Sequence, residues 1–139
     1  MTGHNRHCFT YGSLMTEHIM FGVCGMQLSA KPARLTGFSR HPVKDEDYPG
    51  IVPSDADEVH GVLYLAVPAD AIARLDAFEG EQYRRTPVTV ECPDGQQLSA
   101  DTYVFRPELA HLLLPGDWDE AAFEREGRAR FERKFTRED

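Results

Sequence analysis

The chain has 139 residues, of which 41% are hydrophobic and 27% are charged, and this composition is ordinary for one globular domain. A formal net charge of −8 argues against nucleic acid or an anionic membrane as the main partner, because both select basic surfaces. The longest apolar run, residues 62–67, is too short to cross a membrane, and residues 1–7 lack the apolar segment of a secretory signal. Three widely spaced cysteines favour free thiols in a reducing compartment. We therefore expect one cytoplasmic domain over residues 1–139, with residues 1–6 as a disordered leader.

The first half of the chain predicts two strands with a helix between them. Residues 7–11 form a candidate strand that ends at Gly12, and residues 33–38 form a second candidate. Residues 16–26 carry apolar side chains at intervals of three or four, which is typical of a helix. The acidic stretch 45–58 contains two prolines and a glycine. We expect it to be one long surface loop.

The second half begins with a strand and a helix. Residues 61–67 are apolar or glycine throughout, as in a strand that is buried on both faces. Residues 69–79 predict a helix, and Gly80 is placed to end it at the C′ position.

A hairpin and a last helix complete the prediction. Residues 83–91 and 97–105 alternate between apolar and polar side chains, and the turn Pro93-Asp94-Gly95 joins them. Asp117 can cap a last helix that runs to about Phe135, within a C-terminal segment 117–137. This order of elements predicts a mixed α/β domain around a strongly curved sheet.

The segment Phe9-Thr-Tyr-Gly-Ser-Leu14 is the first candidate site. Glycine at position 12 allows the backbone to approach a ligand closely, and successive N–H groups in such a turn can face an anion. The alternative is a plain turn from strand to helix. The segment matches neither the Gly-x-Ser-x-Gly elbow of hydrolases nor a Walker loop.

Glu79 is the second candidate. Ile72, Leu75 and Glu79 are spaced to share the apolar face of the predicted helix. A carboxyl group that is buried there would have a raised pKa, in the useful range for a general base. The alternative is that this last helical residue turns outward into water. We expect Glu81 to be solvated, and Asp76 to pair with a nearby arginine.

The third candidate is a pair of tyrosines. If the hairpin centres on Asp94, Tyr83 lies opposite Phe105 and Arg85 lies opposite Tyr103, so Tyr83 and Tyr103 share one face. That face would lie next to Glu79. The alternative is that both are ordinary half-buried strand aromatics.

A metal site has little support in the sequence. His4 and His7 form a His-x-x-His pair, but no third ligand follows at a suitable spacing, so surface histidines are expected. Cys24 is expected in the core rather than as a nucleophile. Arg40 is expected at the surface; the alternative is that it reaches an anionic group.

Together these segments resemble the gamma-glutamylcyclotransferase-like family. The resemblance rests on Tyr11-Gly-Ser-Leu14 and on Leu75-Asp-x-Phe-Glu-Gly80 followed by Tyr83-Arg84, with Tyr48-Pro-Gly-Ile-Val-Pro53 and Gly61-Val-Leu-Tyr64 between them. Gly116-Asp-Trp-Asp119 before the last helix is similar to the branch named after a plant avirulence-induced gene. The resemblance covers most of the chain, from about His7 to Phe135.

The resemblance implies a fold and a reaction. The fold is a small curved barrel of mixed strands flanked by helices. The reaction releases 5-oxoproline from a gamma-glutamyl amine, amino acid or peptide, when the substrate's own α-amine attacks its γ-carbonyl. The resemblance implies that the reaction needs no metal and no organic cofactor, and that the partner is a small-molecule substrate. From the lack of an exposed apolar stripe in the sequence we expect a monomer.

The resemblance also implies residue roles. Glu79 is the general acid and base. The N–H groups of Gly12, Ser13 and Leu14 hold the glutamyl carboxylate or the developing oxyanion, and Tyr11 begins their loop. Tyr103 and Tyr83 are pocket tyrosines. Two alternatives remain: a non-catalytic module of the same fold that recognises a small acidic metabolite, and a protein with a vestigial pocket.

Overall fold

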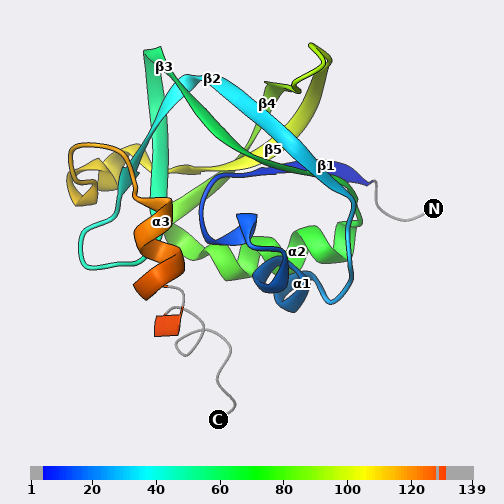
Figure 1. Cartoon of the computed structure of the whole chain (residues 1–139), viewed down its shortest axis with the longest axis horizontal. Helices are drawn as coiled ribbons and strands as arrows, with labels where there is room; N and C mark the ends of the chain where they lie inside the picture. Colours follow the sequence, from blue (N-terminus) through cyan, green and yellow to red (C-terminus); the bar gives the residue numbers. More distant parts are fainter. Residues whose placement is uncertain (1–4, 128, 131–139) are drawn as a thin grey trace.

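A closed barrel forms the centre of the molecule. The computed structural model describes residues 5–127 and 129–130, and within them the strands follow the order β1-β3-β2-β4-β5 around the barrel (Figure 1). The strands are β1 (Arg6–Thr10), β2 (Ala30–Pro42), β3 (Pro49–Val67), β4 (Tyr83–Glu91) and β5 (Gln97–Phe105). Neighbouring strands are antiparallel except β1 and β5, which are parallel and close the barrel. The predicted mixed fold with a curved, closed sheet is confirmed.

Helices lie to one side of the barrel. The α-helices are α1 (Glu17–Cys24), α2 (Ala69–Glu79) and the short α3 (Glu120–Ala122). Three 3-10 segments, η1 (Ser13–Met15), η2 (Gly80–Gln82) and η3 (Pro107–Leu112), and the π-helical turn η4 (Phe123–Gly127) complete the described elements. Figure 1 shows α1 and α2 side by side along the barrel, with α3 apart from them near the turn between β2 and β3. Within the described residues, no helix combines the length and hydropathy needed to cross a membrane.

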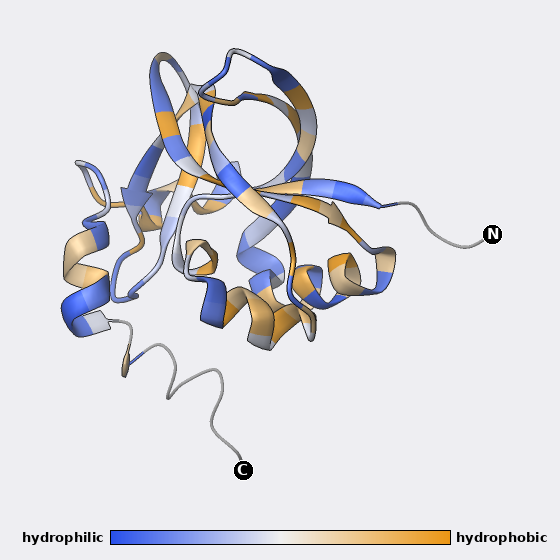
Figure 2. Ribbon diagram, turned by 45° about the vertical axis from the view of Figure 1, so that its right-hand side comes forward, coloured by the Kyte–Doolittle hydropathy of each residue, from blue (hydrophilic) through white to orange (hydrophobic). Residues whose placement is uncertain are grey.

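Two hydrophobic clusters result from the alternation of side chains along the strands. Phe9, Leu63 and their neighbours come from the strands and strand ends, and they fill the barrel. Cys8 and Tyr64, each next to one of them in the chain, point the other way and join the cluster that also contains α1 and α2. Figure 2 shows hydrophobic residues interspersed with hydrophilic ones along the strands. The predicted double burial of residues 61–67 therefore holds at Leu63 and Tyr64, whereas Ala66 is exposed.

The predicted bounds of α2 and of the two hairpin strands, β4 and β5, are confirmed to the residue. Helix α2 covers Ala69–Glu79, and Gly80 follows with a φ of 78°, a conformation that glycine adopts without steric cost. The β4–β5 hairpin pairs Tyr83 with Phe105 and Arg85 with Tyr103. The cysteines Cys8, Cys24 and Cys92 are free, as expected, and all three are buried, which was expected of Cys24.

The predicted loop over residues 45–58 is wrong, because most of it belongs to β3. Residues 49–53 pair with residues 42–38 of β2, and Ile51 is fully buried inside the barrel. Only residues 43–48 form the connecting turn. The prolines misled the prediction, but Pro49 is the first residue of its strand, and Pro53 precedes a shift in register over residues 54–57. Both are positions where a strand tolerates a missing N–H group.

The predictions at the two chain ends need correction. Asp119, not Asp117, caps α3, because its carboxylate accepts a hydrogen bond from the N–H group of Ala122 at 3.0 Å. The predicted continuation of the helix through residues 131–137 lies outside the described residues, as do residues 1–4 of the expected leader. Arg6, which we assigned to that leader, already belongs to β1.

Candidate functional site

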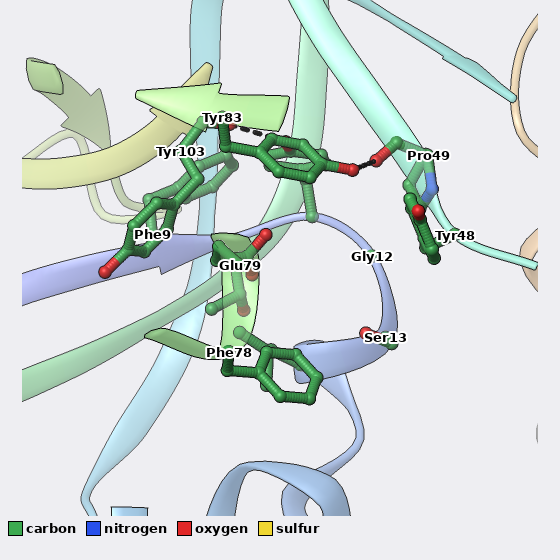
Figure 3. Close-up of a pocket in the computed structure, with 12 residues that line it drawn as sticks. Phe9, Gly12, Ser13, Tyr48, Pro49, Phe78, Glu79, Tyr83 and Tyr103 are labelled. Atoms are coloured by element: carbon green, nitrogen blue, oxygen red, sulfur yellow. Dashed lines mark hydrogen bonds between the residues drawn. The ribbon is translucent and has the colours of Figure 1, made fainter. Parts of the chain in front are cut away.

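A cavity of about 130 Å³ lies between the end of α2, the loop after β1 and the barrel. This volume is many times the roughly 10–15 Å³ that one water molecule needs. The lining residues are Phe9, Thr10, Tyr11, Gly12, Ser13, Leu14, Tyr48, Pro49, Phe78, Glu79, Tyr83 and Tyr103 (Figure 3). Every site residue that the sequence predicted is among them. The structure therefore brings together three segments that are far apart in the chain.

Glu79 enters the cavity from the last turn of α2. Figure 3 shows its carboxyl group among the aromatic side chains, with the Phe78 ring on one side and the Tyr83 ring on the other. Burial raises the pKa of Glu79 to about 8. The group is therefore mostly neutral at pH 7, yet it can ionise within the physiological range. Glu81, just beyond the end of the helix, is exposed as expected.

The loop after β1 forms the opposite wall of the cavity. The Tyr11 hydroxyl donates to the carbonyl oxygen of Tyr103 at 2.5 Å, and the Tyr64 hydroxyl donates to the carbonyl of Leu14 at 2.8 Å. Ser13 and Leu14 are the first residues of η1, so their N–H groups have no acceptor within that helix. Hydrogen bonds to groups outside the loop thus hold it near both ends.

Glycine is required at position 12 by close packing. A Cβ atom on Gly12 would lie 2.7 Å from Cδ of Pro49, whose ring cannot rotate away. The loop can therefore lie directly against the start of β3 only because residue 12 has no side chain.

Tyr83 and Tyr103 line the cavity, but their hydroxyl groups bind protein acceptors. The Tyr83 hydroxyl donates to the carbonyl oxygen of Pro49 at 2.7 Å, and the Tyr103 hydroxyl donates to Oδ1 of Asp76 at 2.6 Å. Asp76 also accepts from Nε of Arg85 at 2.9 Å, which confirms the predicted pairing of Asp76 with an arginine. Burial raises the pKa of both tyrosines well above the ordinary value of 10. Both therefore stay neutral, and their hydroxyl groups are held by these acceptors.

Sequence reasoning gave no individual role to five of the lining residues. Phe9, Phe78, Tyr48 and Pro49 complete the aromatic and apolar wall, and Thr10 lies between Phe9 and the loop. Phe9 and Phe78 directly precede or flank predicted site residues, and Tyr48 and Pro49 begin one of the family-like motifs. Their position beside predicted site residues or within a family-like motif could have indicated them. Tyr48 and Pro49 were missed because residues 45–58 were predicted as a surface loop, whereas β3 starts at the cavity.

Metal ligands are not gathered anywhere in the part of the chain that the structure describes. Nδ1 of His7 accepts a hydrogen bond from the N–H group of Ala66 at 3.0 Å, and His4 lies outside the described residues. Glu79 is the one ionisable carboxyl among the described lining residues, and no lysine or arginine is among them. A negative group in this cavity would therefore depend on neutral donors, such as hydroxyl groups and backbone N–H groups of the lining residues. The arrangement offers one carboxyl group that can gain and lose a proton.

Comparisons with known proteins agree with this geometry. The family model for gamma-glutamyl cyclotransferase, AIG2-like proteins matches residues 8–120. The AIG2-like protein A of Arabidopsis thaliana is 30% identical over 130 residues, which cover 93% of this chain and 78% of that protein.

Solved structures share the fold. A solution structure of an Arabidopsis thaliana protein has a TM-score of 0.70 and 29% identity, and it covers 94% of this chain and 87% of its own. A structure named gamma-glutamyl cyclotransferase has a TM-score of 0.64 over 73% of this chain and 67% of its own; at 21% identity this likeness concerns the fold alone. Barrel, cavity and family model agree, and the chain belongs to the gamma-glutamyl cyclotransferase, AIG2-like family.

Proposed function

We propose that this protein is a cyclotransferase that releases 5-oxoproline from a gamma-glutamyl amine, amino acid or peptide. One observation carries the proposal: a half-buried carboxyl group that desolvation gives a raised pKa, Glu79, lies across a small aromatic cavity from the loop that begins at Tyr11. Family membership and the family-like motifs support the same reaction.

Binding of the substrate falls to the loop and the tyrosines. The N–H groups of Gly12, Ser13 and Leu14 bind the glutamyl carboxylate or the oxyanion that forms on the γ-carbonyl oxygen. Such preorganised donors stabilise developing charge without having to reorient during the reaction. The rings of Tyr83 and Tyr103 restrict the glutamyl chain to the folded shape in which its own nitrogen and carbonyl carbon meet.

The chemical steps need one group that both accepts and donates a proton. Ionised Glu79 takes a proton from the α-ammonium group, and the freed lone pair forms the bond to the γ-carbonyl carbon. Collapse of the tetrahedral intermediate breaks the bond to the leaving nitrogen, which Glu79 protonates. The attacking nitrogen loses two protons on its way from ammonium group to ring amide. Glu79 transfers them one after the other to the leaving nitrogen, which ends as an ammonium group. Holding nucleophile and carbonyl together removes a large part of the barrier.

An assay of 5-oxoproline release tests the proposal. Wild-type protein is incubated with gamma-glutamyl amines, gamma-glutamyl amino acids and glutathione, beside Glu79→Gln and the matched control Glu81→Gln. We expect Glu79→Gln to keep its fold and to lose at least ~10²-fold in activity, the usual worth of a positioned acid and base. Glu81→Gln should retain full activity, because Glu81 is exposed and lies outside the cavity lining.

Two outcomes would contradict the proposal. Full activity in Glu79→Gln would remove Glu79 from the chemistry. Tight binding of 5-oxoproline in calorimetry without turnover of any substrate in the panel would instead favour a binding module that recognises a small acidic metabolite.

A further inference from the structure

Arg40 is not the surface residue that we expected. It lies on β2, and its side chain is only 13% exposed. Its Nη1 atom donates to the carbonyl oxygen of Tyr11 at 2.8 Å, and its Nε and Nη2 atoms donate to the two carboxylate oxygens of Asp117 at 2.8 and 3.2 Å. The guanidinium carbon also lies 5.3 Å from the centre of the Trp118 ring. Arg40 therefore connects the segment before α3 to the first residue of the cavity loop.

The contact with Tyr11 determines the direction of the next N–H group. The described peptide bonds are all trans, so the carbonyl of Tyr11 and the N–H group of Gly12 point in opposite directions across one plane. Tyr11 and Gly12 line the cavity, and Arg40 is not among the lining residues. When the Tyr11 carbonyl faces Arg40, the Gly12 N–H group faces away from Arg40.

This peptide needs an anchor because of the residue that follows it. Glycine restricts its own backbone angles less than any other residue, so the plane before Gly12 rotates easily unless its carbonyl is held. Arg40 holds that carbonyl with a charged donor, which is stronger than a neutral one and polarises the peptide toward a better N–H donor.

We propose that Arg40 is a positioning residue: by holding the Tyr11 carbonyl it orients the Gly12 N–H group as a donor to an anionic group in the cavity. Asp117 and Trp118 hold Arg40 in turn. The identity of the anionic group, a glutamyl carboxylate or oxyanion, rests on the proposed function. The orientation of the peptide does not.

An arginine suits this position better than a lysine. Its planar guanidinium reaches the Tyr11 carbonyl and both oxygens of Asp117 at once, and its flat face lies over Trp118. A lysine ammonium has no such fork.

The test compares Arg40→Met with Arg34→Met. Both arginines lie on β2 and pair with carboxylates, but Arg34 is 43% exposed and binds Glu91 and Glu58 at the surface. Methionine keeps much of the apolar stem and removes the charged donors. The first readout is the Gly12 amide signal in the NMR spectrum of the ligand-free protein. The second is the affinity for 5-oxoproline in calorimetry.

We expect Arg40→Met to shift the Gly12 amide signal and to weaken 5-oxoproline binding about tenfold, which is the scale of one well-placed hydrogen bond. Arg34→Met should change neither readout. The NMR titration of the Glu79 carboxyl should stay near pH 8 in Arg40→Met, which would show that the rest of the cavity is intact. If Arg40→Met does not fold, Arg40→Lys takes its place with effects in the same direction.

An unmoved Gly12 signal together with wild-type affinity would overturn the proposal. If wild-type protein itself neither binds 5-oxoproline nor releases it from any substrate, the proposed function fails. In that case the role of Arg40 is still tested by comparing the Gly12 amide signal of ligand-free Arg40→Met with that of ligand-free wild type.

Discussion

The carboxyl group of Glu79 shows the conflict between stability and chemistry at the scale of one residue. Its surroundings raise its pKa from 4.5 to about 8, and desolvation is the cause. In the folded protein the neutral form is favoured, whereas an unfolded chain ionises near pH 4.5. The same burial that destabilises the ionised form gives the group a pKa near the working range of a general base.

Stability and activity should therefore respond to pH in opposite directions. Because the folded pKa is raised, the unfolded state releases its proton first, and the free energy of unfolding falls as pH rises from about 4.5 to about 8. Glu79→Gln removes this dependence, so its melting temperature should equal that of wild type near pH 4 and exceed it at pH 8. Meanwhile kcat/KM of wild type should rise with pH through about 8, as Glu79 ionises.

Thermal unfolding of both proteins between pH 4 and pH 9 measures the first effect, and a pH–rate profile measures the second. Glu81→Gln is the control and should follow wild type in both. A melting temperature of Glu79→Gln that parallels wild type at every pH would show that Glu79 is not desolvated.

At the scale of elements, the last turn of α2 is connected to the β4–β5 hairpin through Asp76. One oxygen of Asp76 accepts from the Tyr103 hydroxyl and from Arg85, and Arg85 also donates to Asp101 at 2.8 Å. Asp76 precedes Glu79 by three residues on the same helix. This contact therefore fixes the helical turn that carries Glu79 relative to a wall of the cavity.

Asp76→Asn should weaken that connection. The Arg85 pair is partly exposed and contributes little, but the hydroxyl of the buried Tyr103 loses a charged acceptor, so we expect a loss of about 1–2 kcal/mol in the free energy of unfolding. Asp70→Asn is the matched control, because Asp70 forms an exposed pair with Arg74 on the same helix. Urea denaturation measures both variants. Equal losses in the two variants would show that the hydrogen bond from Tyr103 to Asp76 does not contribute to the free energy of unfolding.

At the scale of the whole molecule, the barrel closes at a single paired position. Cys8 of β1 lies opposite Asp101 of β5, and the buried Asp101 carboxylate binds both Arg6 and Arg85. Burial acts to raise the pKa of Asp101, but the hydrogen bonds and charges of the two arginines outweigh it and lower the pKa. The ionised carboxylate thus fastens β1 to β5.

Asp101→Asn should lower the free energy of unfolding at pH 7, because the buried side chain at position 101 loses its charged hydrogen bonds to Arg6 and Arg85. The folded pKa is depressed, so this stabilisation is present above the ordinary pKa of aspartate and is lost as pH falls through the folded value. Wild type and variant should therefore converge in strong acid. Urea denaturation at pH 7 and pH 3 measures this, with the exposed Asp55→Asn as control. A difference that is the same at both pH values would contradict the role of charge.

Features that depend on near neighbours in the chain could be predicted from the sequence. The bounds of α2 follow from its apolar spacing and from Gly80, and the β4–β5 register follows from one turn at residues 93–95. Once the register was known, Tyr83 and Tyr103 had to share a face. Local pattern made Glu79 and the loop at residues 11–14 candidates, and the family resemblance implied their roles, although no local pattern places them side by side.

Features that depend on distant partners required the folded chain. The run 49–53 contains two prolines and a glycine, and only pairing with β2 and the burial of Ile51 make it a strand. Arg40 binds Asp117, which is 77 residues away in the chain. Asp117 therefore pairs with Arg40, and Asp119 caps α3 instead. The sequence alone could not decide whether Glu79 faces water or a cavity, because the residues around it are distant in the chain. The desolvation that sets its pKa comes from side chains of β1, β3, β4 and β5, which only the closed barrel brings to the end of α2.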